Sequence, residues 1–298
     1  MPEKPLWLRK KLPIGSKVSE MADDLNTSRL FTICQEACCP NQGECFSMGT
    51  ATFLIMGNIC TRNCAFCAVT HGKPGPIDND EPERIVQKIK TLGLTFVVIT
   101  SVTRDDLPDG GSDYFHHVIT TIRKCCSSVG IEVLIPDFQG QDAALHRVLQ
   151  AGPDVLNHNV ETVPRLYSAI RPQAQYKRSL ALLQRAKEID NRIITKSGLM
   201  VGMGETKDEI RDVLRDLHAV QCDSLTIGQY LCPSPDHFPV REYIRPEIFD
   251  EYKNLALNIG FKCVFASPFT RSSYMADQSC RTAKDFNINH HSFFKEGS

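Results

Sequence analysis

The alternation of two sequence patterns constrains the fold of this chain more than any other feature. Between residues 51 and 258, six short apolar runs rich in β-branched residues alternate with amphipathic segments of helical period. Such runs are typical of parallel strands buried on both faces, and such segments are typical of helices that cover a sheet. The expected strands span residues 52–56, 96–100, 132–135, 154–157, 193–201 and 224–228. The expected helices span residues 82–92, 114–126, 142–150, 176–189 and 207–220.

Strands that alternate with helices in this way build a parallel α/β fold. A closed barrel of eight strand–helix units usually needs about 250 residues, whereas only six units are visible here. We therefore expect a partial (βα)6 TIM-like barrel, with a doubly wound sheet as the main alternative. The chain divides into an irregular N-terminal extension (1–48), the partial barrel (49–260) and an irregular C-terminal extension (261–298) that holds one more apolar run, 263–266.

The charge balance of the chain is nearly neutral. The 34 basic and 35 acidic residues leave a net charge of −1, which offers no electrostatic case for binding nucleic acid or a membrane surface. No apolar run is long enough to span a bilayer, and the first residues lack the apolar core of a secretory signal. We therefore expect a cytoplasmic protein with neither nucleic acid nor a membrane as a partner.

Cysteine is the unusual residue type, with 13 in the chain. In a reducing compartment, cysteines are more often metal ligands or buried apolar groups than disulfides. Cys60, Cys64 and Cys67 form a Cys-x3-Cys-x2-Cys loop just after the first expected strand. Three thiolates on one loop can bind three irons of a 4Fe–4S cubane, and without a fourth cysteine at loop spacing one iron stays open to a substrate. Zinc is the alternative, with His71 completing a tetrahedral set, although a close trio fits zinc poorly.

A second group of cysteines lies upstream of this loop. Cys34, Cys39 and Cys45 give the spacing Cys-x4-Cys-x5-Cys, and the neighbouring Cys38 makes Cys34, Cys38 and Cys45 a rival set. Three more thiolates so close to the first trio indicate a second iron–sulfur cluster. Zinc ligation or a redox pair is the alternative interpretation.

The cysteine loop, with Phe66 before its last cysteine, resembles the signature of the radical S-adenosylmethionine (SAM) superfamily. In that superfamily the open iron binds SAM, an electron from the cluster releases a 5′-deoxyadenosyl radical, and the fold is a partial barrel. The two cysteine patterns together resemble the lipoyl synthase family. This resemblance extends over essentially the whole chain, through residues 4–9, 39–45, 49–57, 100–111, 157–162, 196–205 and 271–274.

Lipoyl synthases insert two sulfur atoms at carbons 6 and 8 of an octanoyl chain that is carried on a lysine of a lipoyl carrier domain. These C–H bonds are unactivated, so a radical has to remove the hydrogens, while the protein supplies position and excludes water. The resemblance implies two 4Fe–4S clusters and two SAM molecules per lipoyl group. It assigns Cys34, Cys39, Cys45 and Ser273 to the second cluster, which donates the sulfur, with Ser272 as the alternative fourth ligand.

The resemblance also implies catalytic residues and partners. The catalytic residues are Cys60, Cys64, Cys67 and Ser273. The partners are octanoylated carrier domains, namely the acyltransferase subunits of 2-oxoacid dehydrogenases and the H protein of glycine cleavage. An electron donor such as ferredoxin or flavodoxin is implied as well.

Polar residues follow the expected strands at the edge where ligands bind in parallel α/β folds. The expected SAM contacts are Thr103, Asp105, Asn157, Asn159, Glu161, Lys196 and Ser197. Lys196 is expected to meet the carboxylate of SAM, and Glu161 or Asn159 its ribose hydroxyls or ammonium group. His158 is either a further contact or a buried, hydrogen-bonded histidine.

Two other function classes compete with a lipoyl synthase. One is a different radical SAM enzyme with an auxiliary cluster, either biotin synthase-like or methylthio-transferring. The upstream cysteines combined with the Arg-Ser-Ser-Tyr segment 271–274 argue against it. The other is a non-catalytic iron–sulfur scaffold, which predicts no SAM pocket and is disfavoured by the polar residues at the strand ends.

Overall fold

The computed structural model describes residues 3–9, 27–37, 39–41, 44 and 52–293 of the chain. Its strands form one sheet whose spatial order follows the chain from β1 to β8. The short β1 (Phe31–Thr32) pairs with β2 in the antiparallel sense, and all later pairings are parallel. The parallel strands are β2 (Thr52–Ile55), β3 (Phe96–Ser101), β4 (Gly130–Leu134), β5 (Val155–Asn157), β6 (Ile194–Val201), β7 (Ser224–Gln229) and β8 (Cys263–Ser267).

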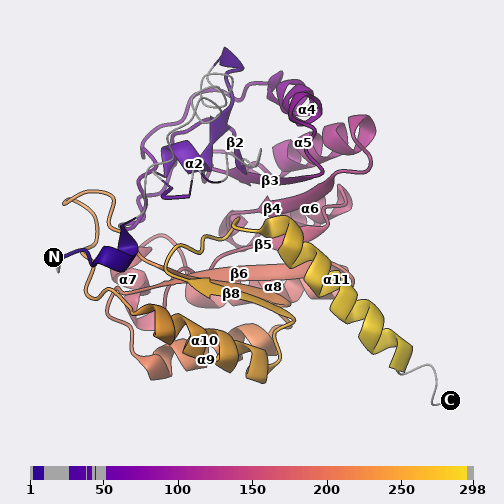
Figure 1. Ribbon diagram of the computed structural model, residues 1–298. Helices are drawn as coiled ribbons and strands as arrows, with labels where there is room; N and C mark the ends of the chain where they lie inside the picture. Colours follow the sequence, from indigo (N-terminus) through magenta and orange to yellow (C-terminus); the bar gives the residue numbers. More distant parts are fainter. Residues whose placement is uncertain (1–2, 10–26, 38, 42–43, 45–51, 294–298) are drawn as a thin grey trace.

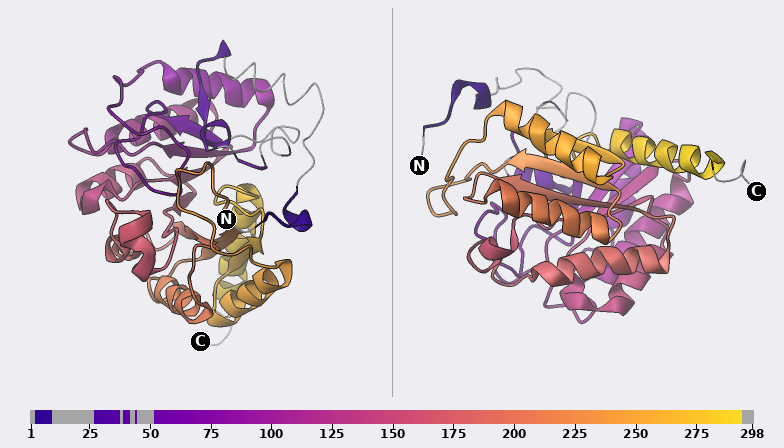
Figure 2. Two further views of the ribbon diagram at one scale, coloured as in Figure 1. Left: turned by 90° about the vertical axis from the view of Figure 1, so that its left-hand side faces the viewer. Right: turned by 90° about the horizontal axis from the view of Figure 1, so that it is seen from below.

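A helix follows each strand from β2 to β7 and lies on the outer side of the curved sheet (Figures 1 and 2). Every crossover leads to the next strand in the same direction, so the sheet curls instead of reversing its strand order as a doubly wound sheet does. The expected partial (βα)6 barrel is confirmed. The covering helices are α4 (Glu81–Leu92), α5 (Ser112–Cys125), α6 (Asp142–Gln150), α8 (Tyr176–Ile189), α9 (Lys207–Ala219) and α10 (Pro246–Ile259). The shorter helices are η1 (Leu6–Leu8), α2 (Ile33–Glu36), η2 (Phe138–Gly140), η3 (Pro164–Leu166) and α7 (Tyr167–Ile170).

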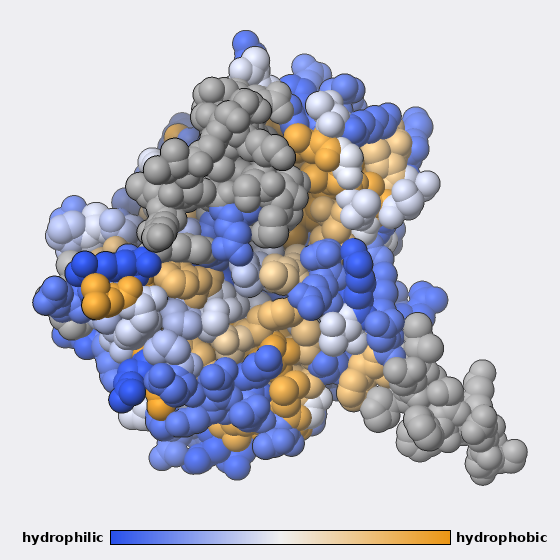
Figure 3. All heavy atoms as spheres, in the orientation of Figure 1, coloured by the Kyte–Doolittle hydropathy of each residue, from blue (hydrophilic) through white to orange (hydrophobic). Residues whose placement is uncertain are grey.

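The burial pattern explains why these strands and helices could be predicted from the sequence. Strands β2 and β7 are buried at every residue, which requires the continuous apolar runs of a sheet covered on both faces. Helix α9 buries Ile210, Val213, Leu214 and Leu217 on one face, whereas the outer surface over α9 and α10 is mainly hydrophilic (Figure 3). In the described part of the chain, no helix is both long and apolar enough to cross a membrane.

The C-terminal extension is more regular than its sequence predicts. The run 263–266 becomes β8, and the polar tail becomes the helix α11 (Ala276–Phe293). Cys280 of this helix packs against Val155 and Ile194, the first residues of β5 and β6. Helix α11 therefore covers the amino ends of the barrel strands and leaves their carboxyl ends available to ligands.

Candidate active site

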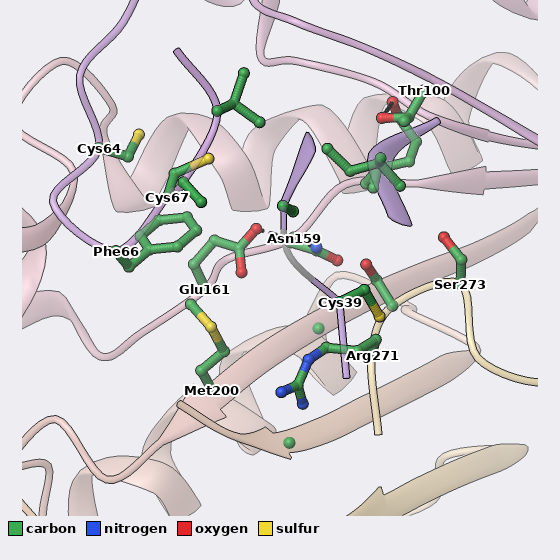
Figure 4. Close-up of a pocket in the computed structure, with 18 of the residues that line it drawn as sticks. Cys39, Cys64, Phe66, Cys67, Thr100, Asn159, Glu161, Met200, Arg271 and Ser273 are labelled. Carbon is green, nitrogen blue, oxygen red and sulfur yellow. Dashed lines mark hydrogen bonds between the residues drawn. The ribbon is translucent and has the colours of Figure 1, made fainter. Parts of the chain in front are cut away.

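A cavity of about 570 Å³ opens at the carboxyl ends of the parallel strands. The loop after β2 brings Cys64 and Cys67 to one side of it, and Cys39 and Ser273 lie on the opposite side (Figure 4). Glu161 lies between the two groups (Figure 4). Segments from both ends of the chain and from the middle of the barrel therefore meet in one cavity.

The cysteine loop is held in shape by contacts to its own backbone and to the loop after β3. The Sγ of Cys60 accepts N–H groups from Arg62 at 3.4 Å and from Thr103 at 3.3 Å. The hydroxyl of Thr61 donates to the carbonyl of Thr103 at 2.9 Å and accepts the N–H of Asp105 at 3.0 Å. Amide donors aimed at a ligand sulfur stabilise its negative charge and tune iron–sulfur clusters, so this loop suits a cluster thiolate at Cys60.

Burial controls the acidity of the other two thiols. Burial raises the pKa of Cys67 to about 12. Burial also raises the pKa of Cys64, although the nearby charge of Arg171 opposes that shift. Such thiols are protonated at neutral pH, and ligands of this kind release their protons when a metal or cluster binds.

Arg62 ties the cysteine loop to two strand ends. Its buried guanidinium donates to both oxygens of Asp105, at 2.6 and 2.9 Å, and to Asp137 at 2.6 Å. Burial alone would raise the pKa of Asp137, but the hydrogen bond and charge of Arg62 outweigh it and lower that pKa to about 2. Asp105 does not line the cavity. Its carboxylate is engaged by Arg62, which positions the loop, and the expected contact between Asp105 and SAM stays a prediction.

Glu161, Asn159 and Arg171 form a polar group beside the cysteine loop, in which Asn159 is buried and the other two are partly buried. Asn159 Nδ2 donates to Glu161 Oε1 at 3.0 Å, and Arg171 donates to the Asn159 carbonyl at 3.1 Å. Asn159 Oδ1 and Arg171 Nε are buried without a hydrogen-bond partner among the described residues. Glu161 adopts a left-handed φ of 66°, and burial raises its pKa. Unsatisfied polar atoms and backbone strain of this kind are typical of ligand sites.

Three expected SAM contacts lie below the cavity and do not line it. Lys196 is fully buried, and its Nζ lies 3.0 and 3.1 Å from the carboxylate oxygens of Glu132. Asn157 donates to the same carboxylate at 2.8 Å, and Ser197 Oγ accepts the N–H of Val160 at 3.3 Å. These residues lie within β5 and β6, not beyond their carboxyl ends, and the Lys196 ammonium is paired with Glu132. A contact between Lys196 and the SAM carboxylate stays a prediction.

His158 is buried and hydrogen-bonded, and it is also among the residues that line the cavity. Its Nδ1 lies 2.8 Å from the carbonyl oxygen of Ile135, and its Nε2 lies 2.9 Å from Ser179 Oγ. Burial lowers its pKa to about 4. The ring is therefore neutral at physiological pH and acts as a structural link. Thr103, Asn159 and Glu161 line the cavity, as their positions after the strands predict.

The second group of expected ligands lies across the cavity. Cys34, Cys39, Ser272 and Ser273 all line it, and burial raises the pKa of Cys34 to about 11. Cys38 and Cys45 lie outside the described residues. Thiols and serine hydroxyls from segments more than two hundred residues apart therefore face one space.

Comparison with known proteins identifies the fold and the family. The family model of the radical SAM superfamily matches residues 54–217, from β2 to α9. The lipoyl synthase of Caldicellulosiruptor saccharolyticus is 54% identical over 279 residues, which cover 94% of this chain and 98% of that protein. The chain belongs to the lipoyl synthase family of the radical SAM superfamily. The lipoyl synthase of Nitrosococcus oceani is 53% identical over 276 residues, which cover 92% of this chain and 85% of that protein.

Solved structures agree with the barrel. SuiB of Streptococcus suis bound to SAM superposes with a TM-score of 0.56 at 10% identity, over 76% of this chain and 53% of that one. The methylornithine synthase PylB gives a TM-score of 0.52 at 14% identity, over 85% and 79%. As a member of the radical SAM superfamily, the chain is an enzyme that uses a 4Fe–4S cluster and SAM.

Sequence reasoning about the lipoyl synthase motifs missed several residues of this site. Arg62 lies inside the cysteine motif, and its charge between two ligand cysteines is the signal that could have drawn attention to it. Neither Arg171 nor Asp137 belongs to one of the sequence motifs named above. His237 places its Nε2 3.0 Å from the Cys67 carbonyl oxygen and so fastens the loop after β7 to the cysteine loop.

Proposed function

We propose that this chain inserts two sulfur atoms at carbons 6 and 8 of an octanoyl chain on a lysine of a lipoyl carrier domain, using two SAM molecules. The observation that carries the proposal is the single cavity lined by Cys60, Cys64 and Cys67 and also by Cys39 and Ser273. A radical source and a sulfur source that face one space can act in turn on the same carbon of an alkyl chain, first removing a hydrogen and then adding sulfur. Family membership at more than 50% identity supports the same reaction.

The residues around the first cysteine trio divide the work of holding SAM. When bound to Cys60, Cys64 and Cys67, a 4Fe–4S cluster supplies the electron that converts SAM into a hydrogen-abstracting radical. The carboxylate of Glu161 and the free Oδ1 of Asn159 are available to accept hydrogen bonds from SAM. Their burial strengthens such bonds, because no water competes for them.

On the far side of the cavity we propose a second 4Fe–4S cluster held by Cys34, Cys39, Cys45 and Ser273, and this cluster is the sulfur donor. Ser273 carries the fourth ligand in this proposal, and Ser272 is the alternative. An alkoxide is a harder ligand than a thiolate, so it would leave readily when the cluster is dismantled. Cys34 and Cys39 lie on the cavity wall, which supports their part of the assignment.

The cavity wall between the two groups suits an alkyl chain. Leu54, Leu134 and Met200 contribute apolar side chains to it, and such a wall excludes water from a radical. We propose that the carrier domains are those of 2-oxoacid dehydrogenase acyltransferase subunits and of the glycine cleavage H protein. In the same proposal, the electron donor is a ferredoxin or flavodoxin and the enzyme works in the cytoplasm. The chain divides into an N-terminal extension (1–48), the partial barrel (49–260) and a C-terminal extension (261–298).

The decisive experiment supplies all substrates to the reconstituted enzyme. The protein is loaded with iron and sulfide under anaerobic conditions and mixed with SAM, a reductant and an octanoylated lysyl peptide. We expect 5′-deoxyadenosine and a peptide whose mass has increased by two sulfurs. Production of 5′-deoxyadenosine without any sulfur gain would contradict sulfur insertion and favour another radical SAM reaction.

Two variants separate the roles of the two ligand groups. Replacement of Cys60, Cys64 and Cys67 by alanine is expected to abolish 5′-deoxyadenosine formation. Replacement of Ser273 by alanine is expected to leave 5′-deoxyadenosine formation intact and to abolish sulfur insertion. Full sulfur insertion by the Ser273→Ala variant would mean that Ser272 is the fourth ligand instead. The Ser272→Ala variant then tests that assignment.

A further inference from the structure

Two hydrogen bonds join the upstream cysteine segment to the C-terminal serine turn. The buried Asn41 donates from its Nδ2 to the carbonyl oxygen of Phe269 at 2.6 Å. The hydroxyl of Tyr274 lies 3.2 Å from a carboxylate oxygen of Glu44. These contacts bracket the two serines of the turn from both sides, and they connect residues about 230 positions apart in the chain.

The serine turn is also pressed against strand β7, and only glycine at position 228 permits this. A Cβ atom at Gly228 would overlap the carbonyl oxygen of Thr270 and come within 3.1 Å of the Arg271 guanidinium. The backbone N–H of Gln229 donates to the Pro268 carbonyl at 3.3 Å at the same place. Since the clash would involve backbone atoms, a larger residue at 228 would push the whole turn away from β7.

The turn is rigid in itself. The N–H of Thr270 donates to the Ser267 carbonyl at 3.0 Å, and the two hydroxyls of these residues lie 2.9 Å apart. The guanidinium of Arg271 donates to the Thr270 carbonyl at 2.7 Å, and the start of the Arg271 side chain lies near Cys39 (Figure 4). The N–H of Tyr274 donates to the Arg271 carbonyl at 2.9 Å. Protein atoms alone therefore define where the two serines lie.

We propose that Asn41 and Gly228 are positioning residues of the auxiliary cluster site: Asn41 holds the serine turn (267–274) to the Cys39 segment, and Gly228 lets the turn lie against β7, before any cluster binds. This inference rests on the second cluster of the proposed function. A serine oxygen is a weaker iron ligand than a thiolate. The free energy gained when it binds iron is therefore too small to offset a large entropy loss from ordering the turn. Fixing the turn beforehand removes that cost, which is how preorganisation improves binding.

Iron content tests the inference without using catalysis. In full-length chain with Cys60, Cys64 and Cys67 replaced by alanine, bound iron and sulfide report the auxiliary site alone, and about four of each are expected per chain. Asn41→Asp turns a donor into an acceptor facing the Phe269 carbonyl. We expect Asn41→Asp and Gly228→Ala to bind less than about half of that iron, because a lost contact of this kind weakens binding about tenfold.

The chain provides matched controls. Asn254 is exposed on α10, and Gly75 has open space where a Cβ would lie. Asn254→Asp and Gly75→Ala in the same background should retain about four irons. If Asn41→Asp and Gly228→Ala also retain the full iron content, the inference is overturned while the second cluster stands. If the parent retains none, the second cluster is refuted, and the positioning role with it.

Hydrogen exchange measured on iron-free protein separates positioning from general unfolding. We expect Asn41→Asp to speed exchange in the peptide that covers 267–274 about tenfold, since the hydrogen bond to the Phe269 carbonyl is lost. Exchange in strand β4 should stay unchanged. Unchanged exchange at 267–274 would overturn the inference, because the turn would then be fixed without Asn41.

Discussion

Substitution of Lys196 by methionine separates a structural role for this residue from a role in binding SAM. The Lys196 ammonium lies within 3.1 Å of both carboxylate oxygens of Glu132, and both side chains are fully inaccessible to solvent. Methionine fills a similar volume and removes the charge. The Glu132 carboxylate is then left in the barrel interior with the Asn157 amide as its remaining hydrogen-bond donor among the described residues.

The expected cost follows from that unpaired charge. Breaking a buried ion pair by removing one partner costs about 3–5 kcal/mol, and the free energy of unfolding of a typical protein is about 5–15 kcal/mol. The Lys196→Met variant should therefore lose a large part of its stability. A double variant that also carries Glu132→Gln removes both charges and keeps an acceptor for Asn157. It should recover at least about 2 kcal/mol of the lost unfolding free energy, because no unpaired charge remains and the effects of two substitutions at contacting residues are not additive.

Urea unfolding followed by far-ultraviolet circular dichroism measures these free energies by linear extrapolation. SAM binding to the reconstituted protein is measured in parallel. The reasoning predicts a large loss of stability and, where the variant folds, an unchanged affinity for SAM. A loss of unfolding free energy below about 1 kcal/mol, combined with weakened SAM binding, would refute the structural role of Lys196. So small a loss is typical of an exposed salt bridge and not of a buried ion pair.

Three further predictions concern pH and capping. Because Arg62 lowers the pKa of Asp137 to about 2, the stability from this pair is present above pH 3.8 and is lost as pH falls toward 2; Arg62→Gln should raise the pH midpoint of acid unfolding seen by circular dichroism. Because burial lowers the pKa of His158 from 6.5 to about 4, the unfolded chain binds more protons between these values, so stability falls as pH falls through this window. His158→Gln should flatten the dependence of the urea midpoint on pH there. Thr206 and Glu209 form a capping box at the start of α9, and Thr206→Ala should cost about 1 kcal/mol in urea unfolding.

The barrel could be predicted from the sequence because its strands are buried on both faces. Strand β7 is buried along its whole length, and its residues from Ser224 to Gly228 are apolar or small, so the strand was predicted to within one residue of its observed end at Gln229. Helix α11 could not be predicted, because it covers the strand ends with few apolar side chains such as Cys280 and Ala283. Its buried residues Ala276, Ser279, Cys280 and Ala283 follow a helical spacing, but they are small or polar, so the apolar signal of this period is weak.

In the candidate site, residues whose role depends on local spacing could be predicted, and residues whose partners are distant in the sequence could not. Cys60, Cys64 and Cys67 were predicted because their chemistry depends on spacing within one loop. The pairing of Lys196 with Glu132 was not predicted, because a sequence does not show how deep along a strand a side chain lies. Arg62 was missed because its carboxylate partners, Asp105 and Asp137, are 43 and 75 positions away, and only the fold brings them together.

The place of Ser273 in the fold has a consequence for enzyme turnover. This serine lies on the short connection between β8 and α11, and both elements are built into the barrel. It cannot move far without detaching a strand and a helix. If the auxiliary cluster is consumed during sulfur insertion, the serine side of the site therefore keeps its place afterwards. Repeated catalysis then depends on how fast new iron and sulfide are delivered, and no refolding of the protein is required between rounds.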